Sequence, residues 1–227
     1  MKVNRVSEKF WNNKDNIEWF KKRPMSPYWI DFFSHIPSIT NKRVLDLGCG
    51  TGRNSEMLIN LGYNVYCCDR YATMIKETKN LLKKMKLSRQ FINGHVSIQS
   101  MDRLSFKPDF FDIVLSHGVY HNAFTEEEFK KSIQESARVL KNSGFLCYNI
   151  FSSNILPDLS LSPQKNHTYT TKEGLPIILF SKKEFIEIAE ALKLKNYIEP
   201  VEYESNVSTG KRSVVRGVLI KKLNSKN

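Results

Sequence analysis

VLDLGCGTGRNS, residues 44–55, joins a short apolar run to three glycines and then to a segment with the pattern of a helix. A glycine-rich turn between a strand and a helix lets the backbone approach a ligand closely. It also leaves the amides of the helix N-terminus free to bind that ligand. The stretch therefore indicates an α/β protein with a nucleotide-type cofactor, although the glycines alone do not say which one.

The rest of the chain repeats this alternation of strands and helices. The expected strands are residues 43–48, 64–69, 95–101, 111–117 and 144–151, and the expected helices are residues 27–35, 54–61, 72–86 and 126–140, with one more after Ser181. Ser26 and Pro27 fit the start of the first of these helices. Such alternation predicts a parallel sheet with helices on both faces.

Two helix starts and the C-terminal end of the chain add detail. Thr125 with Glu128, and Ser181 with Glu184, have the spacing of capping boxes. The end of the chain reads as two strands, NYIEPVEYE and SVVRGVLIKKL, separated by the turn NVSTGK. Strands joined this closely can only pair antiparallel, so the sheet is expected to be parallel with an antiparallel end.

Length and composition fit one domain, because the chain has 227 residues and 41% hydrophobic content. No apolar run approaches the roughly 18 residues that cross a bilayer, and the first residues lack the apolar core of a signal peptide. A cytoplasmic protein without membrane contact is the expectation. Cys49, Cys67, Cys68 and Cys147 lie in or beside strand-like runs without CxxC spacing, which predicts reduced core thiols.

The net charge of +12 is the one bulk property that points to nucleic acid. Only 10 of the 35 basic residues are arginine, the residue whose planar fork suits phosphate. The densest basic run forms one face of an expected helix, with apolar residues opposite: Lys76, Lys79, Lys83 and Lys86 against Ile75, Leu82 and Met85. This pattern favours a solvated surface over a nucleic-acid stripe, and it leaves attraction of an acidic substrate open.

The residues around the glycines favour a cationic cofactor. A dinucleotide motif would place a glycine where Arg53 stands, and no Gly-Lys-Ser/Thr of a P-loop is present. Asp46 would repel a pyrophosphate but suits an ammonium group, and S-adenosylmethionine carries an ammonium and a sulfonium without any phosphate. Asp69 ends the second expected strand, 21 residues after Gly48, where a carboxylate can accept both ribose hydroxyls. Together the two acids predict a nucleoside cofactor site.

The stretch VLDLGCGTGRNSEMLINLGYNVYCCD resembles the first two motifs of class I S-adenosylmethionine-dependent methyltransferases. SMDRLSF, FDIVLSHGVYHN and ARVLKNSGFLCYNIF resemble that family's later strand ends, so the likeness covers about residues 40–151. GTGRNS is similar to the tellurite-resistance-type group and GVYHN to the ubiquinone-type group. The resemblance implies a Rossmann-like three-layer sandwich with a seven-stranded, mostly parallel sheet of order 3-2-1-4-5-7-6, in which strand 7 is antiparallel.

The resemblance also implies roles for single residues. Gly48, Gly50 and Asp46 would hold the methionine part of S-adenosylmethionine, and Asp69 would bind the ribose. Arg70 or Met74 would pack beside the adenine ring, and Met101 and Asp102 would lie at the edge of that ring. Ser116 or His117 would line the far wall of the cofactor site. Asp102 has a second interpretation, as an aspartate that opens a turn before Arg103.

His117, Tyr120 and His121 are the candidate catalytic bases, since they follow the fourth expected strand. The sulfonium is already a strong electrophile, so a base is needed only if the acceptor must lose a proton. His121 matches a histidine common in the family, which implies a structural or cofactor-side role. His117 should face the cleft, although a histidine satisfied by the backbone is an equal alternative. His117 and His121 are four residues apart and could bind one metal ion only if they lay on a helix, so no metal is expected.

The chain is expected to form one methyltransferase domain over residues 1–227, with two additions that could supply the acceptor pocket. Residues 1–40 form an aromatic helical cap, whose Trp11, Trp19, Tyr28 and Trp29 could contact the sulfonium or pack a helix on the sheet. Residues 152–180 form a lid-like insertion with the polar candidates Asp158, His167 and Tyr169.

The sequence therefore favours methyl transfer to an oxygen or nitrogen of a small-molecule acceptor, which could be acidic. The alternatives are an RNA or tRNA methyltransferase, supported by the charge and by Lys21, Lys22 and Arg23, and a cofactor-binding scaffold without catalysis. The oligomeric state stays open.

Overall fold

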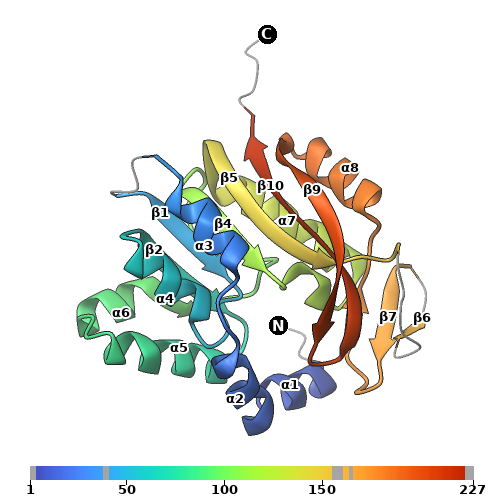
Figure 1. Cartoon of the computed structure of the whole chain (residues 1–227), viewed down its shortest axis with the longest axis horizontal. Helices are drawn as coiled ribbons and strands as arrows, with labels where there is room; N and C mark the ends of the chain where they lie inside the picture. Colours follow the sequence, from blue (N-terminus) through green and yellow to red (C-terminus); the bar gives the residue numbers. More distant parts are fainter. Residues whose placement is uncertain (1–3, 38–40, 155–160, 164–165, 223–227) are drawn as a thin grey trace.

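The structure is a computed structural model that describes residues 4–37, 41–154, 161–163 and 166–222. Its centre is a seven-stranded sheet of order β3-β2-β1-β4-β5-β10-β9 (Figure 1). The strands are β1 (Arg43–Leu47), β2 (Asn64–Asp69), β3 (Val96–Ile98), β4 (Phe111–His117), β5 (Leu140–Phe151), β9 (Leu194–Val207) and β10 (Gly210–Lys221). β1 to β5 pair in parallel, and β10 is antiparallel to both β5 and β9. This confirms the expected strand order and the antiparallel end.

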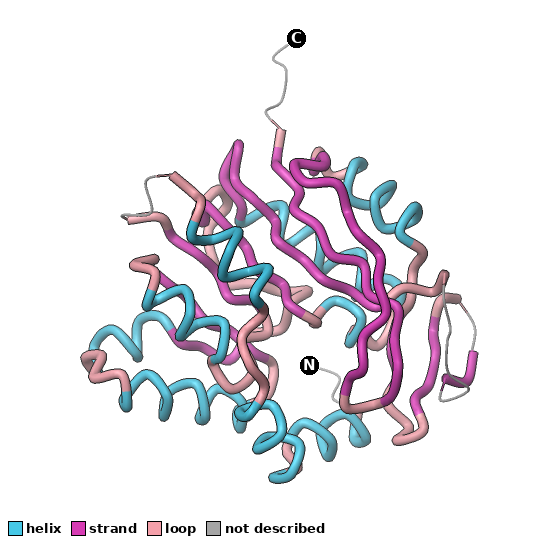
Figure 2. Tube along the Cα trace, in the orientation of Figure 1, coloured by secondary structure: helices cyan, strands magenta, loops and turns pink. Residues whose placement is uncertain are grey.

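Helices cover both faces of the sheet (Figure 2). They are α1 (Arg5–Trp11), α2 (Lys14–Lys22), α3 (Pro27–Ser34), α4 (Arg53–Asn60), α5 (Ala72–Lys84), α6 (Arg89–His95), α7 (Glu126–Val139) and α8 (Lys182–Ala191), with a short 3-10 helix η1 (Tyr120–Asn122). The buried faces of α3 to α6 share one core cluster with the sheet, and those of α7 and α8 share another. Within the described ranges, no helix is both long and apolar enough to cross a membrane.

The apolar periods explain these layers. Val44, Leu45 and Leu47 of β1 are all buried, as expected for a central parallel strand with helices on both faces. On α5, Ile75 and Leu82 are buried and the lysines lie on the other side, which confirms the solvated basic face. The four cysteines are free and buried, as the sequence indicated.

The two expected capping boxes differ. The Ser181 hydroxyl accepts from the Glu184 amide at 3.2 Å, and the Glu184 carboxylate accepts from the Ser181 amide at 2.8 Å, so this box is complete. Thr125 caps α7 through the Glu128 amide at 3.1 Å. The Glu128 carboxylate, however, accepts from the amide of Phe124 at 3.0 Å and pairs with Arg70. The second half of that box is therefore wrong.

Residues 152–180 contain more regular structure than their sequence suggested. β6 (Leu161–Pro163), β7 (Thr168–Thr171) and β8 (Pro176–Ile178) form a separate antiparallel sheet. Each of these strands has only three or four residues, which is too short to show alternation. Strands this short leave no clear period in the sequence of the segment.

Candidate functional site

A cavity lies at the C-terminal ends of β1, β2 and β4, where connections leave the sheet in opposite directions. Its empty volume is about 940 Å³, part of it open to solvent. Ligands of open α/β sheets bind at this kind of crevice. Six of the residues with an expected cofactor role line it: Gly48, Gly50, Asp69, Arg70, Met74 and Met101.

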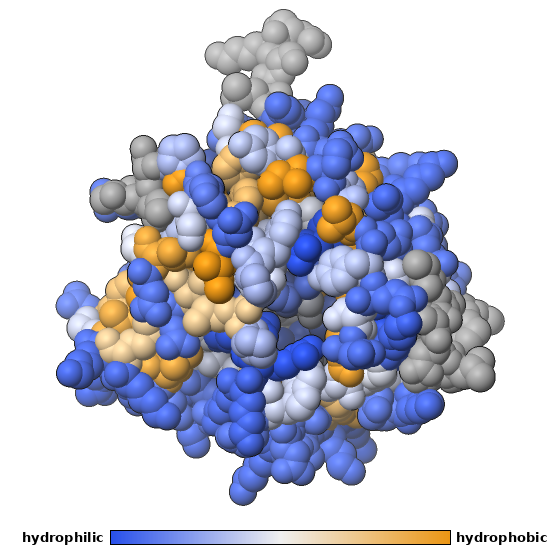
Figure 3. All heavy atoms as spheres, viewed as in Figure 1, coloured by the Kyte–Doolittle hydropathy of each residue, from blue (hydrophilic) through white to orange (hydrophobic). Residues whose placement is uncertain are grey.

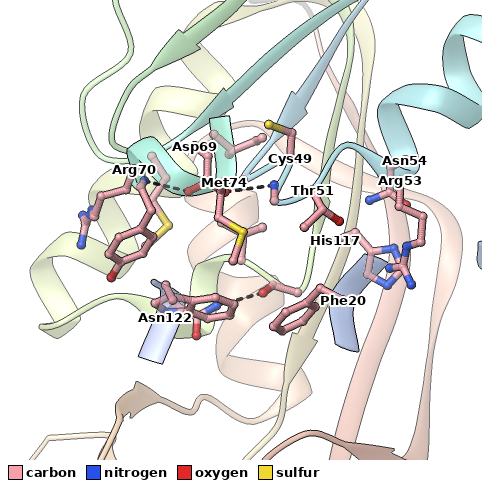
Figure 4. Close-up of a pocket in the computed structure, with 18 of the residues that line it drawn as sticks. Phe20, Cys49, Thr51, Arg53, Asn54, Asp69, Arg70, Met74, His117 and Asn122 are labelled. Atoms are coloured by element: carbon pink, nitrogen blue, oxygen red, sulfur yellow. Dashed lines mark hydrogen bonds between the residues drawn. The ribbon is translucent and has the colours of Figure 1, made fainter. Parts of the chain in front are cut away.

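The glycine turn and Asp69 form one end of the cavity (Figure 4). The Asp69 carboxylate accepts hydrogen bonds from the backbone amides of Gly50 at 3.0 Å and Tyr71 at 2.9 Å, one on each oxygen. Burial raises the pKa of Asp69, and the amides of Tyr71 and Gly50 oppose that shift. Each oxygen keeps a free lone pair, so the carboxylate can still accept from two ligand hydroxyls.

The positive φ angles of the turn explain its glycines. Gly48 has φ +67°, and a Cβ there would lie 2.5 Å from a methyl carbon of Val119. Gly50 has φ +56°, and a Cβ there would meet nothing within 4 Å. The first glycine is thus required by packing against the β4 loop, and the second borders open space in the cavity.

Asp46, Asp102 and Ser116 do not line the cavity. Asp46 is buried beneath the turn, where one oxygen accepts from the Ser55 hydroxyl at 2.6 Å and the other has no hydrogen-bond partner among the described residues. Burial raises the pKa of Asp46 to about 6. Asp102 accepts from the Ser100 hydroxyl, and Ser116 is completely buried. The cofactor roles of these three residues stay predictions.

The charge of Arg70 is directed toward α7 and away from the cavity that its side chain helps to line. The guanidinium pairs with Glu128, donates to the Ser100 hydroxyl at 2.6 Å, and lies 4.6 Å from the centre of the Phe124 ring. The side chain of Arg70 can therefore pack against a ligand in the cavity, while its guanidinium remains paired with Glu128.

Of the three candidate bases, His117 lines the cavity and the other two lie in the core. Tyr120 is completely buried and donates to the Ser136 hydroxyl at 2.7 Å. His121 stacks on Phe151 with ring centres 3.6 Å apart, and its Nδ1 accepts from the Phe151 amide at 3.2 Å. These contacts fit the structural role that the resemblance offered for His121.

His117 ends β4 on the side of the cavity opposite Asp69 (Figure 4). Its Nδ1 is buried and has no hydrogen-bond partner in the described part of the chain. Burial lowers the pKa of His117 to about 3, with further contributions from the positive charges of Arg53, Arg216 and Arg23. The ring is therefore neutral near pH 7, with one nitrogen able to accept and one able to donate.

An aromatic roof, formed by Trp11 of α1, Phe20 of α2 and Tyr71 at the start of α5, lines one side of the cavity. Trp11 stacks on Phe20 with ring centres 5.3 Å apart and on Tyr71 at 6.1 Å, and all three line the cavity. Asn12 accepts from the Thr73 hydroxyl, which ties the end of α1 to α5.

The other expected aromatic contacts are packing contacts. Trp29 is completely buried in the core between α3 and the sheet, and Arg23 lies 4.3 Å from the centre of the Trp19 ring. Tyr28 packs under Arg216 at 3.7 Å. The packing alternative therefore describes these three residues better than contact with the cavity.

Several lining residues were not assigned a role from the sequence. Cys49, Thr51, Arg53 and Asn54 lie in or directly after the glycine turn, and Phe20, Tyr71, Gln99, Gly118, Val119 and Asn122 lie in loops or on helices beyond it. The first group could have been found, because every residue of such a turn borders its ligand. The second group follows strand ends or comes from α2, where sequence distance gives no signal.

The insertion contributes no described residue to the cavity. His167 lies between two carboxylates, with its ring nitrogens 3.2 Å from Glu126 and 3.0 Å from Glu184. Tyr169 belongs to β7, and Asp158 lies outside the described residues. The lid role of this segment stays a prediction.

The class of protein with this fold and site is indicated by a family match. Residues 45–148 match the family model described as "Methyltransferase domain". This range contains the glycine turn, Asp69 and the end of β4. The match, the fold and the cavity support an S-adenosylmethionine-dependent methyltransferase with S-adenosylmethionine as its cofactor.

Individual relatives agree with this class and differ in what they act on. The chain is 32% identical over 107 residues to an uncharacterized methyltransferase, YodH, of Bacillus subtilis. The matched region covers 45% of this chain and 40% of that protein. Further relatives are named as ubiquinone biosynthesis O-methyltransferase, glycine/sarcosine N-methyltransferase and tRNA methyltransferase. The matches cover between 26% and 60% of the length of these relatives.

Solved structures share the whole fold. The PH0226 protein of Pyrococcus horikoshii has a TM-score of 0.68 at 21% identity, covering 96% of this chain and 97% of that one. The 1,6-didemethyltoxoflavin-N1-methyltransferase of Burkholderia thailandensis, solved with 1,6-didemethyltoxoflavin and S-adenosylhomocysteine, has a TM-score of 0.65 at 18% identity, covering 96% and 88%.

Proposed function

We propose that this protein transfers a methyl group from S-adenosylmethionine to an oxygen or nitrogen of a small-molecule acceptor. One observation carries the proposal. Asp69 and His117 line the same cavity from opposite sides, so a carboxylate that can accept from ribose hydroxyls and a neutral imidazole face one space. Such a cavity can hold a nucleoside at one end and an acceptor at the other.

The residues present fit the cofactor. The Asp69 oxygens can accept from ribose hydroxyls, and the open space at Gly50 leaves room against the turn. Met74 and Met101 provide apolar surface for an adenine ring. The aromatic faces of Trp11 and Phe20 suit a sulfonium, since cations are attracted to the faces of aromatic rings.

Bound S-adenosylmethionine supplies an electrophilic methyl group: the acceptor atom bonds to the methyl carbon while the carbon–sulfur bond breaks and leaves its electron pair on sulfur. Positioning of the acceptor is then the main task of the protein. A neutral His117 can accept a hydrogen bond from the hydroxyl or amine of the acceptor and so hold its lone pair toward the methyl group. Because its pKa is lowered to about 3, His117 orients the acceptor without keeping its proton, which passes to the solvent at the open side of the cavity.

The size of the acceptor is supported by the roof over the cavity. Trp11, Phe20 and Tyr71 enclose it on one side, which leaves room for a small molecule more readily than for a folded RNA. An RNA acceptor is favoured by the net charge of +12 and by the tRNA methyltransferase among the relatives.

Three measurements test the proposal. Calorimetry with S-adenosylhomocysteine should show binding, and methyl release from S-adenosylmethionine should appear with members of a panel of small hydroxyl and amine compounds. Filter binding of tRNA should be weak and fall steeply with salt, as nonspecific binding to phosphates does. Methylation of tRNA and of no small molecule would favour the RNA alternative. Cofactor binding without turnover on either class would indicate a non-catalytic scaffold.

A further inference from the structure

Three buried polar atoms without hydrogen-bond partners lie in one row across the sheet. They are Nδ1 of His117, Oδ1 of Asn149 and Nε of Arg216, and none has a partner among the described residues. His117 on β4 pairs with Asn149 on β5, and Asn149 pairs with Arg216 on β10. Side chains of directly paired residues lie on the same face of a sheet. The row therefore places an amide oxygen that accepts, a guanidinium nitrogen that donates and an imidazole nitrogen that can accept in one tautomer side by side.

One end of the row, His117, lines the cavity, and Asn149 and Arg216 extend from it across the face covered by α3. The next row on the same face, two residues away on each strand, consists of Leu115, Cys147 and Val218, which belong to the core cluster that contains Trp29. His117 lines the cavity itself. The side-chain oxygen of Asn149 would be 3.7 Å from a Cβ at Gly118, which also lines the cavity.

Arg216 of this row and two further arginines, Arg53 and Arg23, form no ion pair within the described ranges. Arg53 lines the cavity beside His117 and donates to the Pro24 carbonyl at 2.9 Å (Figure 4). Arg216 lies between the rings of Tyr28 and Tyr203, 3.7 and 4.8 Å from their centres. Arg23 completes the set and donates to the Asn206 carbonyl at 3.2 Å.

In the part of the chain that the structure describes, no carboxylate forms an ion pair with these three arginines. The acid that acts on Arg53 is Asp46, which is buried beneath the glycine turn and forms no ion pair with it. The positive charges of Arg53, Arg216 and Arg23 all help to lower the pKa of His117. Partly buried cations of one sign are costly unless anions join them, and the single carboxylate of the cofactor's methionine part, expected at the glycine turn, cannot balance three arginines. Figure 3 shows a hollow near the centre of this face of the molecule, with strongly hydrophilic residues at its rim.

We propose that the acceptor carries an anionic oxygen group, a carboxylate or a phosphate, which Arg53 and Arg216 bind next to His117 and Asn149. This inference rests on the proposed methyl transfer and names the substrate class of the same site. Arginine suits the task because its planar fork donates two parallel hydrogen bonds to such a group. His117 and Asn149 accept from the hydroxyl or amine that receives the methyl group. The acceptor is thus a small hydroxy or amino acid, or a phosphorylated alcohol or amine.

The first experiment measures anion binding without turnover. Protein saturated with S-adenosylhomocysteine is titrated with acetate, inorganic phosphate and neutral acetamide at constant ionic strength, and binding is followed by calorimetry and by the thermal unfolding midpoint. Acetate or phosphate should bind and acetamide should not, and the tighter of the two anions identifies the group. The variant Arg216→Gln should weaken anion binding at least fivefold, and Arg216→Lys should weaken it less.

Arg89→Gln is the matched control, because it removes the same charge from an exposed arginine at the start of α6. It should change anion affinity less than twofold, and both variants should bind S-adenosylhomocysteine like the wild type. Equal binding of acetamide, no anion binding by the saturated protein, or an unchanged affinity in Arg216→Gln would overturn the inference. Failure to bind S-adenosylhomocysteine would instead overturn the proposed function. In turnover assays, methylation confined to uncharged acceptors would leave the proposed function standing and reject the anionic acceptor.

Discussion

The Asp69 carboxylate accepts a hydrogen bond from the Gly50 amide at 3.0 Å, which joins the end of β2 to the glycine turn after β1. The two elements that the sequence singled out are therefore one unit in the structure. The contact fixes the orientation of the carboxylate at the edge of the cavity that Asp69 lines. Gly48 packs against Val119 and Gly50 borders the open cavity, so the stability of the turn should depend on Gly48 and the binding of the cofactor on Gly50.

Gly48→Ala should destabilise the protein more than Gly50→Ala. At Gly48 a methyl group meets Val119 at 2.5 Å and the backbone is left-handed, which together cost roughly 2–4 kcal/mol. At Gly50 only the backbone strain applies, about 1 kcal/mol, but the added methyl group occupies space at the cavity. Denaturant unfolding and calorimetry with S-adenosylhomocysteine check both effects. Equal stability of the two variants would contradict the packing role of Gly48.

Asp46 predicts a distinct dependence of stability on pH. Its pKa in the folded protein is about 6 against an ordinary value of 3.8, because burial disfavours the charge. The folded state therefore holds this proton more tightly than the unfolded chain. The stability that results is present below about pH 4 and is lost as the pH rises toward 6.

Asp46→Asn cannot ionise and keeps an oxygen that accepts from Ser55. Relative to the wild type, its free energy of unfolding should rise by roughly 1–3 kcal/mol between pH 4 and pH 7. Denaturant unfolding at several pH values measures this difference. Asp31→Asn is the control, since Asp31 is 77% exposed, and it should show no such trend. A constant difference for Asp46→Asn would show that the carboxyl group ionises normally.

The sequence predicted those parts of the fold and site that depend on neighbours in the chain. The strands around Asp69 and the turn at Gly48 were visible because apolar runs, glycines and strand-terminal acids are local patterns. The Ser181 cap was predicted correctly for the same reason. Glu128 shows the limit, because its carboxylate meets Arg70, 58 residues away, in preference to the cap of its own helix.

Residues brought together by strand pairing were not predictable in the same way. His117, Asn149 and Arg216 meet only because β10 inserts between β5 and β9, and their row depends on the register of two strand pairs. The aromatic roof has a similar origin, since Trp11 reaches Tyr71 through the docking of α1 on α5. Neither the register nor that docking has a signature within a short window of sequence.

His117 and His121 should respond differently to substitution. His117→Asn should reduce methyl transfer roughly 10- to 100-fold, because the acceptor loses a positioning hydrogen bond, while the stability changes little. His121→Asn should lower the unfolding midpoint, because it loses the stacking on Phe151 and weakens a buried hydrogen bond. Turnover assays and thermal unfolding separate the two effects. A loss of methyl transfer in His121→Asn, with a loss of stability in His117→Asn, would contradict the roles given to the two histidines.

The roof predicts that one N-terminal tryptophan matters for cofactor affinity. Trp11→Leu should weaken binding of S-adenosylhomocysteine by roughly tenfold, because the ring closes one side of the cavity and stacks on Tyr71. Trp19→Leu is the matched control, since Trp19 does not line the cavity. Calorimetry should show an affinity within threefold of the wild type for this control. Equal losses of cofactor affinity in the two variants would mean that Trp11 does not contact the cofactor and that both tryptophans act only by stabilising the N-terminal helices.

The most direct test of the central claim is the affinity of Asp69→Asn for S-adenosylhomocysteine, measured by calorimetry on protein whose thermal unfolding confirms a folded state. Hydrogen bonds to a charged carboxylate contribute about 1.5–3 kcal/mol, so the affinity should fall roughly 10- to 100-fold. Asp31→Asn should bind like the wild type. An unchanged affinity in folded Asp69→Asn would contradict the assignment of this cavity as the cofactor site.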